Sequence, residues 1–447
     1  MRWTDESIRA ALGLNPGDPN IGYSSIATDT RQIGPGALFV ALEGERFDGH
    51  EFLAAAAAAG AAGAVVRRGT GPVPGLRLFE VDDTLRGFGW LARHRRRQFP
   101  GPVVAVTGTN GKTSTKEMLA AVLGTQYRTH ATRLNLNNLV GVPQTILECP
   151  EGTEALVVEA GANAPGEIAR YREIIEPDIT VITNVDAGHL EGFGSLAGVL
   201  EEKLALARDV PLAIVGGDNP ELAAGARRVA RRVVTAGLSG TDVAADEVVI
   251  QPSGRPRVTI GEVSFTVGQL GLHQAKNAML AWAVGQALGL PAGQVARGLE
   301  SFTLPAGRGD LAQYGRLTLL NDSYNANPAS FRALVDLVRS MRAGRRLVFV
   351  AGTMRELGSH SAAEHTQIAD ELATLDPEVL AAVGEFVPAL ERHRAQFGAR
   401  LLTADDAAAI GPLVAERLRG DELVVLKGSR GVRLERIIPE LVGRAAT

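Results

Sequence analysis

The stretch from Val103 to Thr113 constrains this chain more than any other. Residues 103–106 form a short apolar run typical of a buried strand, which leads directly into Gly108-Thr109-Asn110-Gly111-Lys112-Thr113. The apolar residues that follow recur at helical spacing as far as Leu123, so the segment predicts a strand, a glycine loop and a helix. Such a loop turns backbone N–H groups and a helix N-terminus toward an anion, while Lys adds positive charge and a Thr hydroxyl can hold Mg²⁺. The stretch therefore predicts a phosphate-binding loop in an α/β domain.

The match to the general phosphate-binding loop is incomplete, because that pattern has a Gly where this chain has Val106. The alternative is a strand–turn–helix corner with an exposed Lys. Composition favours a functional Lys, since the chain has 46 basic residues and only five of them are Lys. In a chain so rich in Arg, a retained Lys suggests a site where Arg cannot replace it. The five are Lys112, Lys116, Lys203, Lys276 and Lys427.

Length and composition restrict the classes of protein to consider. At 447 residues the chain exceeds the size of one hydrophobic core, so two or three domains are expected. A formal net charge of −4 gives no electrostatic reason to expect nucleic acid or an anionic membrane as a partner. The single cysteine, Cys149, excludes an intrachain disulfide and is typical of a reducing compartment. No apolar run reaches transmembrane length and residues 1–6 do not resemble a signal peptide, so we expect a cytoplasmic protein. Separately, we expect a monomer.

Pro and Gly clusters divide the chain into three segments. The expected linkers are 100–102 and 304–309, which gives domains at residues 1–99, 100–307 and 308–447. Apolar runs alternate with helical patterns in each segment, an order typical of α/β domains with mainly parallel sheets. We expect a small N-terminal α/β domain, a central domain with a mainly parallel sheet around the phosphate loop, and a C-terminal Rossmann-like domain. Expected strands are 38–41, 64–66, 76–81, 103–106, 156–158, 179–183, 212–215, 317–320, 347–350, 380–383 and 423–426, and expected helices 51–62, 112–123, 273–288 and 328–341.

Polar side chains follow two of the expected central strands. Glu159 comes directly after one of them, and Asn184, Asp186 and His189 come after the next. Ligands of parallel sheets bind beyond the carboxyl ends of the strands, where the phosphate loop also lies. A lone His after a strand is also compatible with an ordinary surface histidine.

With these residues in place, the chain resembles the Mur ligase family, whose members form amide bonds with ATP while building the peptidoglycan precursor. The resemblance covers essentially the whole chain, and the loop 108–113 resembles the family's short phosphate loop. Ser323-Tyr324-Asn325-Ala326-Asn327-Pro328 is the most specific string. The other strings are 135–143, 159–162 and 184–191, which resemble blocks shared by the family, and 189–195, 354–358 and 427–430, which resemble the member that adds D-alanyl-D-alanine.

The resemblance implies an ATP-dependent ligase that adds D-alanyl-D-alanine to UDP-N-acetylmuramoyl-tripeptide through an acyl phosphate, the last peptide addition made in the cytoplasm. Its partners are these two substrates, with no nucleic acid and no membrane insertion. One alternative is the sister ligase that adds the third amino acid, or a folylpolyglutamate-synthase-like enzyme. An alternative from another class is an ATP-binding switch without ligase activity.

The same resemblance implies roles for single residues. Lys112, Glu159, His189 and Lys203 are implied to be catalytic, with two Mg²⁺ ions held by Thr113, Glu159, His189 and a CO₂-derived carbamate on Lys203. The implied ATP contacts are Gly108, Thr109, Asn110, Gly111, Lys112, Thr113, Ser114, Gln274, Asn277, Arg308 and Asp322. The implied substrate contacts are Thr30, Arg31, Asp48, Gly49, His50, Asn137, Asn138, Tyr324 and Asn325.

Several of these roles have alternatives. Lys203 could be a helix-surface Lys beside Glu201 and Glu202, and the glutamate common two residues after the family's modified lysine is absent here. His273-Gln274 stands where the family usually has His-Asn, which changes the expected adenine contact by one methylene. Lys427 and Arg430 are compatible with binding a carboxylate or with surface salt bridges.

Overall fold

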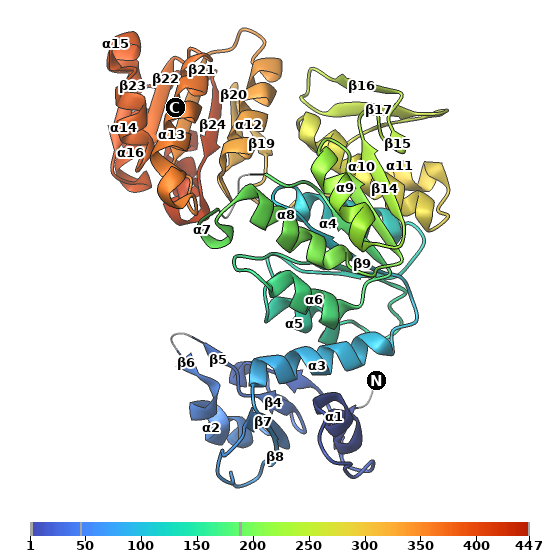
Figure 1. Cartoon of the computed structure of the whole chain (residues 1–447). Helices are drawn as coiled ribbons and strands as arrows, with labels where there is room; N and C mark the ends of the chain where they lie inside the picture. Colours follow the sequence, from blue (N-terminus) through green and yellow to red (C-terminus); the bar gives the residue numbers. More distant parts are fainter. Residues whose placement is uncertain (1–2, 45–46, 187–189, 446–447) are drawn as a thin grey trace. The chain divides into compact units, whose positions relative to one another are not determined.

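The computed structural model describes residues 3–44, 47–186 and 190–445 (Figure 1). Its contacts define two compact units. The first comprises residues 1–105, 127–162 and 166–180, and the second comprises residues 106–126, 163–165 and 181–447. Within the described ranges, no helix combines the length and the apolar character needed to cross a bilayer.

The N-terminal part of the first unit is a four-stranded parallel sheet of order β3-β4-β7-β8. Alternate side chains of β4 face opposite ways, so Leu38 and Val40 join the core beside α1 and α3, whereas Phe39 joins the core beside α2. The elements are β1 (Trp3–Thr4), α1 (Asp5–Leu12), β2 (Gly22–Tyr23), β3 (Ile26–Ala27), η1 (Thr30–Gln32), β4 (Leu38–Val40), β5 (Glu43–Gly44), β6 (Phe47–Asp48), η2 (Gly49–Phe52), α2 (Leu53–Ala58), β7 (Gly63–Arg67), β8 (Arg77–Val81) and α3 (Thr84–Arg97).

The helix expected at residues 51–62 is shorter than predicted. It begins as the 3₁₀ turn η2, where the Asp48 carboxylate accepts the N–H of His50 at 2.9 Å, and α2 proper ends at Ala58. Gly60 then takes a φ of 100°, a left-handed conformation that turns the chain toward β7. The alanine run predicted the helix but not its end, which the glycine determines.

The central sheet has seven strands in the order β10-β11-β9-β12-β13-β14-β15. Strands β9, β11 and β12 are buried along their whole length, as expected for a sheet covered by helices on both faces. The elements are β9 (Val103–Thr107), α4 (Lys112–Gly124), β10 (Thr129–Ala131), α5 (Gly141–Leu147), β11 (Ala155–Glu159), α6 (Glu167–Ile175), β12 (Ile179–Ile182), α7 (Leu190–Phe193), α8 (Leu196–Leu204), η3 (Ala205–Ala207), β13 (Leu212–Gly216), α9 (Pro220–Val229), β14 (Val233–Gly237) and β15 (Val243–Ala244).

A small antiparallel sheet, β16-β17-β18, follows the central sheet and was not predicted. Its strands alternate exposed and covered residues, and Phe265 of β18 stacks on Trp282 of helix α10 with ring centroids 5.4 Å apart. The elements are β16 (Glu247–Ile250), β17 (Pro256–Ile260), β18 (Val263–Thr266), α10 (Leu272–Ala287) and α11 (Ala292–Ser301).

The C-terminal sheet has six strands in the order β19-β20-β24-β21-β22-β23. Only β19 is antiparallel to its neighbour, and β24 lies between β20 and β21 (Figure 1). A separate buried apolar cluster covers each face of the sheet. The Rossmann-like prediction is thereby confirmed. The elements are β19 (Asp310–Tyr314), β20 (Leu317–Asp322), α12 (Pro328–Met341), β21 (Leu347–Gly352), η4 (Gly358–His360), α13 (Ser361–Ala373), β22 (Val379–Val383), α14 (Phe386–Glu391), α15 (Arg394–Phe397), η5 (Gly398–Arg400), β23 (Leu401–Ala404), α16 (Ala407–Ala415), β24 (Leu423–Lys427), η6 (Arg430–Val432), η7 (Leu434–Ile437) and α17 (Ile438–Ala445).

The domain boundaries at 99/100 and 307/308 remain predictions. Each of the sheets with three or more strands lies within one of the three predicted segments. The division into two compact units follows contacts instead, and it passes through strands β9 and β12.

Candidate functional site

The phosphate loop lies between β9 and α4, as predicted. Gly108 and Gly111 have φ values of 144° and 77°, and both are crowded. A Cβ at Gly108 would lie 2.0 Å from Thr183 Oγ1, and a Cβ at Gly111 would lie 2.5 Å from Asn277 Oδ1. Helix α4 begins at Lys112 without a side-chain cap, so its first N–H groups are directed at the loop. This arrangement suits an anion held by the backbone.

The segment after β12 supports the loop from one side. Asn184 accepts the N–H of Asn110 through its side chain at 2.9 Å and the N–H of Thr109 through its carbonyl at 3.1 Å. Thr183 Oγ1 donates to the Asn110 carbonyl at 2.5 Å, and the N–H of Asp186 donates to Thr109 Oγ1 at 3.1 Å. The side chain of Asn184 is therefore committed to shaping the loop.

Helix α10 supports the loop from another side through Gln274 and Asn277, whose ATP contacts remain predictions. Gln274 Nε2 donates to Ser114 Oγ at 3.4 Å, and Asn277 Nδ2 donates to Gln274 Oε1 at 3.2 Å. Lys112 Nζ donates to the carbonyls of Gly108 and Thr109, each at 2.9 Å. Gln274 and Ser114, which are 160 positions apart in the sequence, thus meet at the start of α4.

His273 precedes this pair on α10 and stays neutral at physiological pH. The pKa of its imidazole is lowered to about 4, chiefly by burial. The negative charge of Asp322 opposes this shift, and the positive charges of Lys427 and Lys276 contribute to it. An uncharged ring in this position adds no net charge to the site.

The carboxyl end of β20 gathers four of the predicted residues. Asp322 accepts from Lys427 Nζ at 2.5 Å, and Lys427 also donates to the Asn325 carbonyl at 3.0 Å. The Arg308 guanidinium lies over the Tyr324 ring, 4.0 Å from its centroid. Lys427 is buried, so the idea that it forms a surface salt bridge is wrong; Arg430 does form an exposed pair, with Glu435 at 2.9 Å.

Lys203 lies in the last turn of α8 with its side chain buried, 5.5 Å from the Phe193 ring centroid. The alternative of a helix-surface lysine is therefore wrong. The predicted carbamate is untested. His189 lies outside the described residues.

Glu159 is the last residue of β11 and is buried. Its Oε1 accepts from Asn137 Nδ2 at 2.8 Å, and its N–H donates to Thr132 Oγ1 at 3.0 Å. Asn138 accepts the N–H groups of Val140 at 3.1 Å and Gly141 at 2.8 Å, at the start of α5. Both asparagines, predicted as substrate contacts, thus have structural partners within the first unit.

The N-terminal motifs also make local contacts. Arg31 pairs with Asp29 at the surface, and the hydrogen bond from the Arg31 side chain lowers the pKa of the Asp29 carboxyl to about 2. Thr30 begins the turn η1, and Gly49 packs against the Leu42 backbone, where a Cβ would lie 2.6 Å from the carbonyl. These contacts fix the backbone of the motifs and leave their substrate role a prediction.

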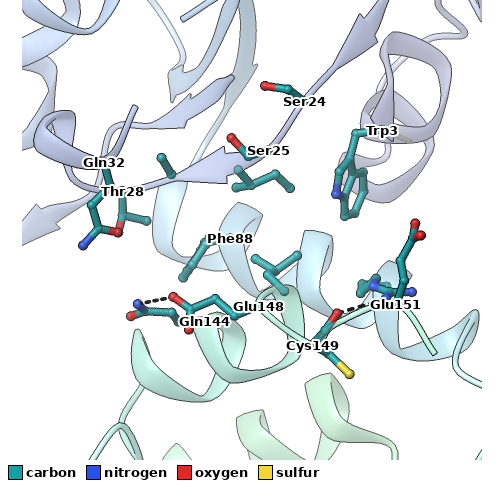
Figure 2. A pocket seen from close by; sticks show the side chains of 14 residues that line it. Trp3, Ser24, Ser25, Thr28, Gln32, Phe88, Gln144, Glu148, Cys149 and Glu151 are labelled. Atoms are coloured by element: carbon teal, nitrogen blue, oxygen red, sulfur yellow. Dashed lines mark hydrogen bonds between the residues drawn. The ribbon is translucent and has the colours of Figure 1, made fainter. Parts of the chain in front are cut away.

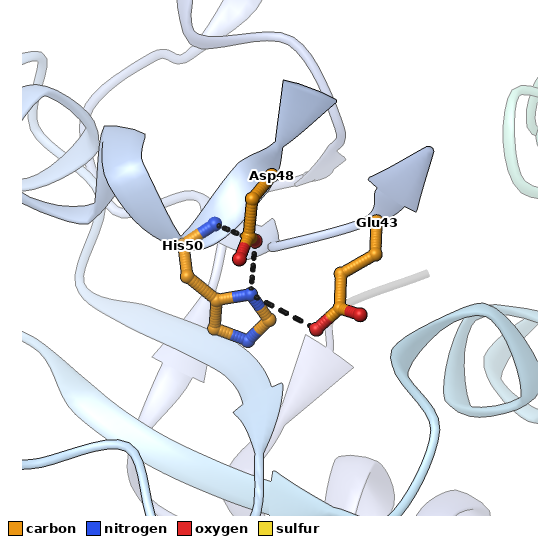
Figure 3. A group of neighbouring side chains, drawn as sticks. All are labelled: Glu43, Asp48 and His50. Atoms are coloured by element: carbon orange, nitrogen blue, oxygen red, sulfur yellow. Dashed lines mark hydrogen bonds and ion pairs between the residues drawn. The ribbon is translucent and has the colours of Figure 1, made fainter. Parts of the chain in front are cut away.

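His50 faces Asp48 and Glu43, a grouping that resembles a metal site (Figure 3). Its Nε2 accepts the N–H of Arg67 at 2.9 Å, so the ring proton is on Nδ1, which donates to Asp48 at 2.6 Å. A metal on Nδ1 would move that proton to Nε2, against the N–H of Arg67. The group therefore joins the β5–β6 hairpin to β7 and does not suit a metal.

A cavity of about 260 Å³ lies in the first unit between β3, α3 and α5 (Figure 2). Its lining includes Thr28 and Gln32, which flank the predicted motif at Thr30 and Arg31. Arg95 Nη2 donates to the Cys149 carbonyl at 3.2 Å at its edge. Sequence reasoning missed this cavity, because its walls come from segments more than 100 residues apart.

Comparisons with known proteins cover most of the chain. The Mur ligase middle domain matches residues 106–285, the glutamate ligase domain of Mur ligases matches residues 307–430, and the catalytic domain of the Mur ligase family matches residues 22–72. The UDP-N-acetylmuramoyl-tripeptide–D-alanyl-D-alanine ligase of Bacillus subtilis is 33% identical over an alignment of 451 positions, which covers 98% of this chain and 97% of that protein.

Solved structures similar to this chain also come from Mur ligases. MurF from Acinetobacter baumannii is 30% identical and has a TM-score of 0.89, with 99% of each chain covered. MurF ligase from Thermotoga maritima, solved with ADP, is 28% identical and has a TM-score of 0.82, covering 94% of this chain and 97% of that one.

Proposed function

The chain belongs to the Mur ligase family, and we propose that it joins D-alanyl-D-alanine to UDP-N-acetylmuramoyl-tripeptide with ATP. The observation that carries the proposal is the near full-length similarity to a curated ligase of that activity. The string Ser323–Pro328 supports the same member of the family, and its residues meet Arg308 and Lys427 at the end of β20.

The reaction needs an activated carboxylate. The γ-phosphoryl group of ATP passes to the terminal carboxylate of the tripeptide, giving ADP and an acyl phosphate. The free amine of D-alanyl-D-alanine attacks the acyl carbon, loses a proton, and the tetrahedral intermediate expels phosphate as the amide forms. Positioning and charge neutralisation supply most of the catalysis in such a transfer.

The phosphate loop is the proposed ATP site. A Cβ at Gly108 or Gly111 would collide with Thr183 or Asn277, so these glycines allow the tight loop that precedes the N-terminus of α4. Lys112 binds the β- and γ-phosphates, with Gly108–Ser114, Gln274, Asn277, Arg308 and Asp322 as the other contacts. The hydroxyl of Thr113 and the carboxylate of Glu159 are oxygen donors of the kind Mg²⁺ prefers.

Lys203 is proposed to carry a carbamate that helps to hold a second Mg²⁺. Its burial agrees with this, because it places the Lys203 side chain inside the molecule and away from the solvated face of α8. His189 is proposed as a further ligand of that ion.

The residues that contact the nucleotide substrate and the dipeptide are proposed from the family resemblance. Thr30, Arg31 and Asp48–His50 are proposed to meet the uridine end, with Asn137 and Asn138 further along the nucleotide. Asn325 is proposed to meet the dipeptide. The chain is proposed to act as a monomer, which light scattering during gel filtration would test.

Phosphate release from MgATP tests the function. UDP-muramoyl-tripeptide and D-alanyl-D-alanine are supplied separately and together, and mass spectrometry follows the product. We expect release that requires both substrates, with a product heavier by the dipeptide less water. Equal release without either substrate would leave only an ATP-binding switch, and product formed from a UDP-muramoyl-dipeptide and a free amino acid would indicate the sister ligase.

A matched pair of lysine variants tests the phosphate loop. Lys112→Met removes the proposed phosphate contact, so the rate should fall by roughly 100-fold or more. Lys276→Met changes an exposed lysine that pairs with Asp218 and has no proposed role, and it should retain the rate. Equal losses in both variants would contradict the assignment of Lys112.

A further inference from the structure

Two guanidinium groups converge on the ring of Tyr324. Arg308 comes from the start of the C-terminal domain, with its Cζ 4.0 Å from the ring centroid. Arg430 follows β24, with its Cζ 5.9 Å from the same centroid. An aromatic face attracts cations through its quadrupole, and the shorter distance is that of a close stack.

The backbone around Arg308 is held next to this ring. The N–H of Tyr324 donates to the Gly307 carbonyl, and the N–H of Gly309 donates to the Asn321 carbonyl, each at 3.0 Å. Gly307 and Gly309 have φ values of 82° and 77°, so Arg308 is flanked by two left-handed residues. This local fold places the Arg308 side chain over Tyr324 before any ligand binds.

The Arg308 side chain has no carboxylate partner among the described residues. Its Nε–H is buried and donates a hydrogen bond to no described atom. Arg430, in contrast, donates to Glu435 at 2.9 Å. The contact of the Arg308 guanidinium within the described residues is therefore the face of the Tyr324 ring.

We infer that Tyr324 is a positioning residue whose ring holds the Arg308 guanidinium ready for the phosphates of the nucleotide. The inference rests on the proposed ligase function. A carboxylate in place of the ring would neutralise the guanidinium and compete with phosphate for its N–H groups. A ring orients the guanidinium plane and leaves those N–H groups free for a bidentate contact. Tyr324 thus acts through Arg308, where the sequence predicted a direct substrate contact.

The test compares Tyr324→Leu with Tyr324→Phe in the full chain, with KM and kcat measured for each substrate. Tyr324→Leu removes the ring, and the KM for ATP should rise roughly tenfold while the KM for D-alanyl-D-alanine stays the same. Tyr324→Phe keeps the ring and should restore the KM for ATP. Tyr314→Leu, which changes a tyrosine on β19 that is 36% exposed, is the matched control and should behave as the wild type.

Binding of a fluorescent ATP analogue gives a readout that does not depend on turnover. We would measure this binding in a double-mutant cycle that combines Tyr324→Leu with Arg308→Lys. Tyr324→Leu should weaken binding in the wild type but add little to Arg308→Lys, because both remove the same stack. Thermal melting checks folding, and Tyr324→Met replaces Tyr324→Leu if the latter unfolds.

Three results would overturn the inference while the wild type remains an active ligase. They are an unchanged KM for ATP in Tyr324→Leu, additive effects in the cycle, or a higher KM for the dipeptide in Tyr324→Phe. The last result would show that the hydroxyl contacts the substrate. A wild type without dipeptide-dependent phosphate release would instead refute the proposed function.

Discussion

At the scale of single residues, Lys203 is the clearest case in which burial changes an interpretation. Its sequence neighbours are two glutamates, which favour a solvated helix face, yet its side chain is 1% exposed. An ammonium removed from water is costly, so a lysine in this position has a structural or chemical reason to be there. The proposed carbamate provides such a reason.

Carbamylation of Lys203 can be observed directly. With ¹³C-labelled bicarbonate, the wild type should show a carbamate carbon signal by NMR that is missing from Lys203→Gln. Turnover of that variant should fall by roughly 100-fold, the range expected when a group that stabilises transition-state charge is lost. Lys276→Gln, an exposed lysine, should keep both the signal and the rate. A signal that persists in Lys203→Gln would refute the assignment.

His273 makes the stability of the protein depend on pH. The pKa of this imidazole is about 4 in the folded chain, below its ordinary value of 6.5. The unfolded chain therefore takes up the proton first as pH falls, so the free energy of unfolding decreases between pH 6.5 and 4. The loss attributable to this group is at most roughly 3 kcal/mol.

The variant His273→Gln isolates this contribution. Urea unfolding followed by tryptophan fluorescence, with Trp282 on the same helix, should give a flatter decline for the variant between pH 6.5 and 4. The difference between wild type and variant should be constant above pH 7.5. Parallel declines across the acid range would contradict the assigned pKa.

At the scale of elements, glycines decide where helices approach one another. Helix α11 carries Gly298 against α4, where an added Cβ would lie 2.6 Å from the Val122 Cα. Gly293, five residues earlier on the same helix, has only the end of a side chain within 4 Å. One helix thus contains both a constrained and an unconstrained glycine.

Alanine at these two positions should have opposite effects. Gly298→Ala forces α11 away from α4 and should lower the free energy of unfolding by about 1–3 kcal/mol. Gly293→Ala only restricts the unfolded chain and should raise it by about 0.4–1 kcal/mol. Urea denaturation measures both, and equal shifts of the same sign would contradict the packing described for α11.

The basic run at the end of α3, residues 93–97, differs from most runs of charged residues. Such a run usually forms a solvated face. In the structure Arg96 is buried and donates to the Ile175 carbonyl at 2.8 Å and to Asp178 at 3.0 Å, while Arg93 and Arg97 pair with Glu176. The run therefore packs α3 against the end of α6. Its partners lie about 80 residues further along the chain, so a local sequence pattern cannot predict them.

At the scale of the whole molecule, the C-terminal segment has the features of an independent domain. Its six-stranded sheet has a buried apolar cluster on each face, and both clusters consist of residues after 308 apart from Leu270. A segment with its own core is expected to fold alone.

The fragment 308–447 tests this boundary. It should give a cooperative thermal transition and dispersed amide signals by NMR, without hydrolysing ATP, since the phosphate loop lies outside it. A fragment that lacks both signatures of folding would show that the domain needs contacts from the central segment.

The sequence by itself determined the elements whose signals are local. The strand, glycine loop and helix at Val103–Gly124 and the helix at Pro328–Met341 follow from periodicity, caps and glycines within a few residues of one another. The resemblance of short strings located most of the proposed nucleotide contacts, because phosphate binding requires particular residues at fixed spacing.

Only the tertiary structure decided which side chains are buried and which distant residues meet. The pairing of Gln274 with Ser114, the stacking of Arg308 on Tyr324 and the burial of Lys203 each depend on segments that the sequence separates. The sheet β16–β18 escaped prediction because its short, half-exposed strands are stabilised by packing such as Phe265 on Trp282. Burial and distant contacts are properties of the packed chain, and a linear pattern carries information only about neighbours along it.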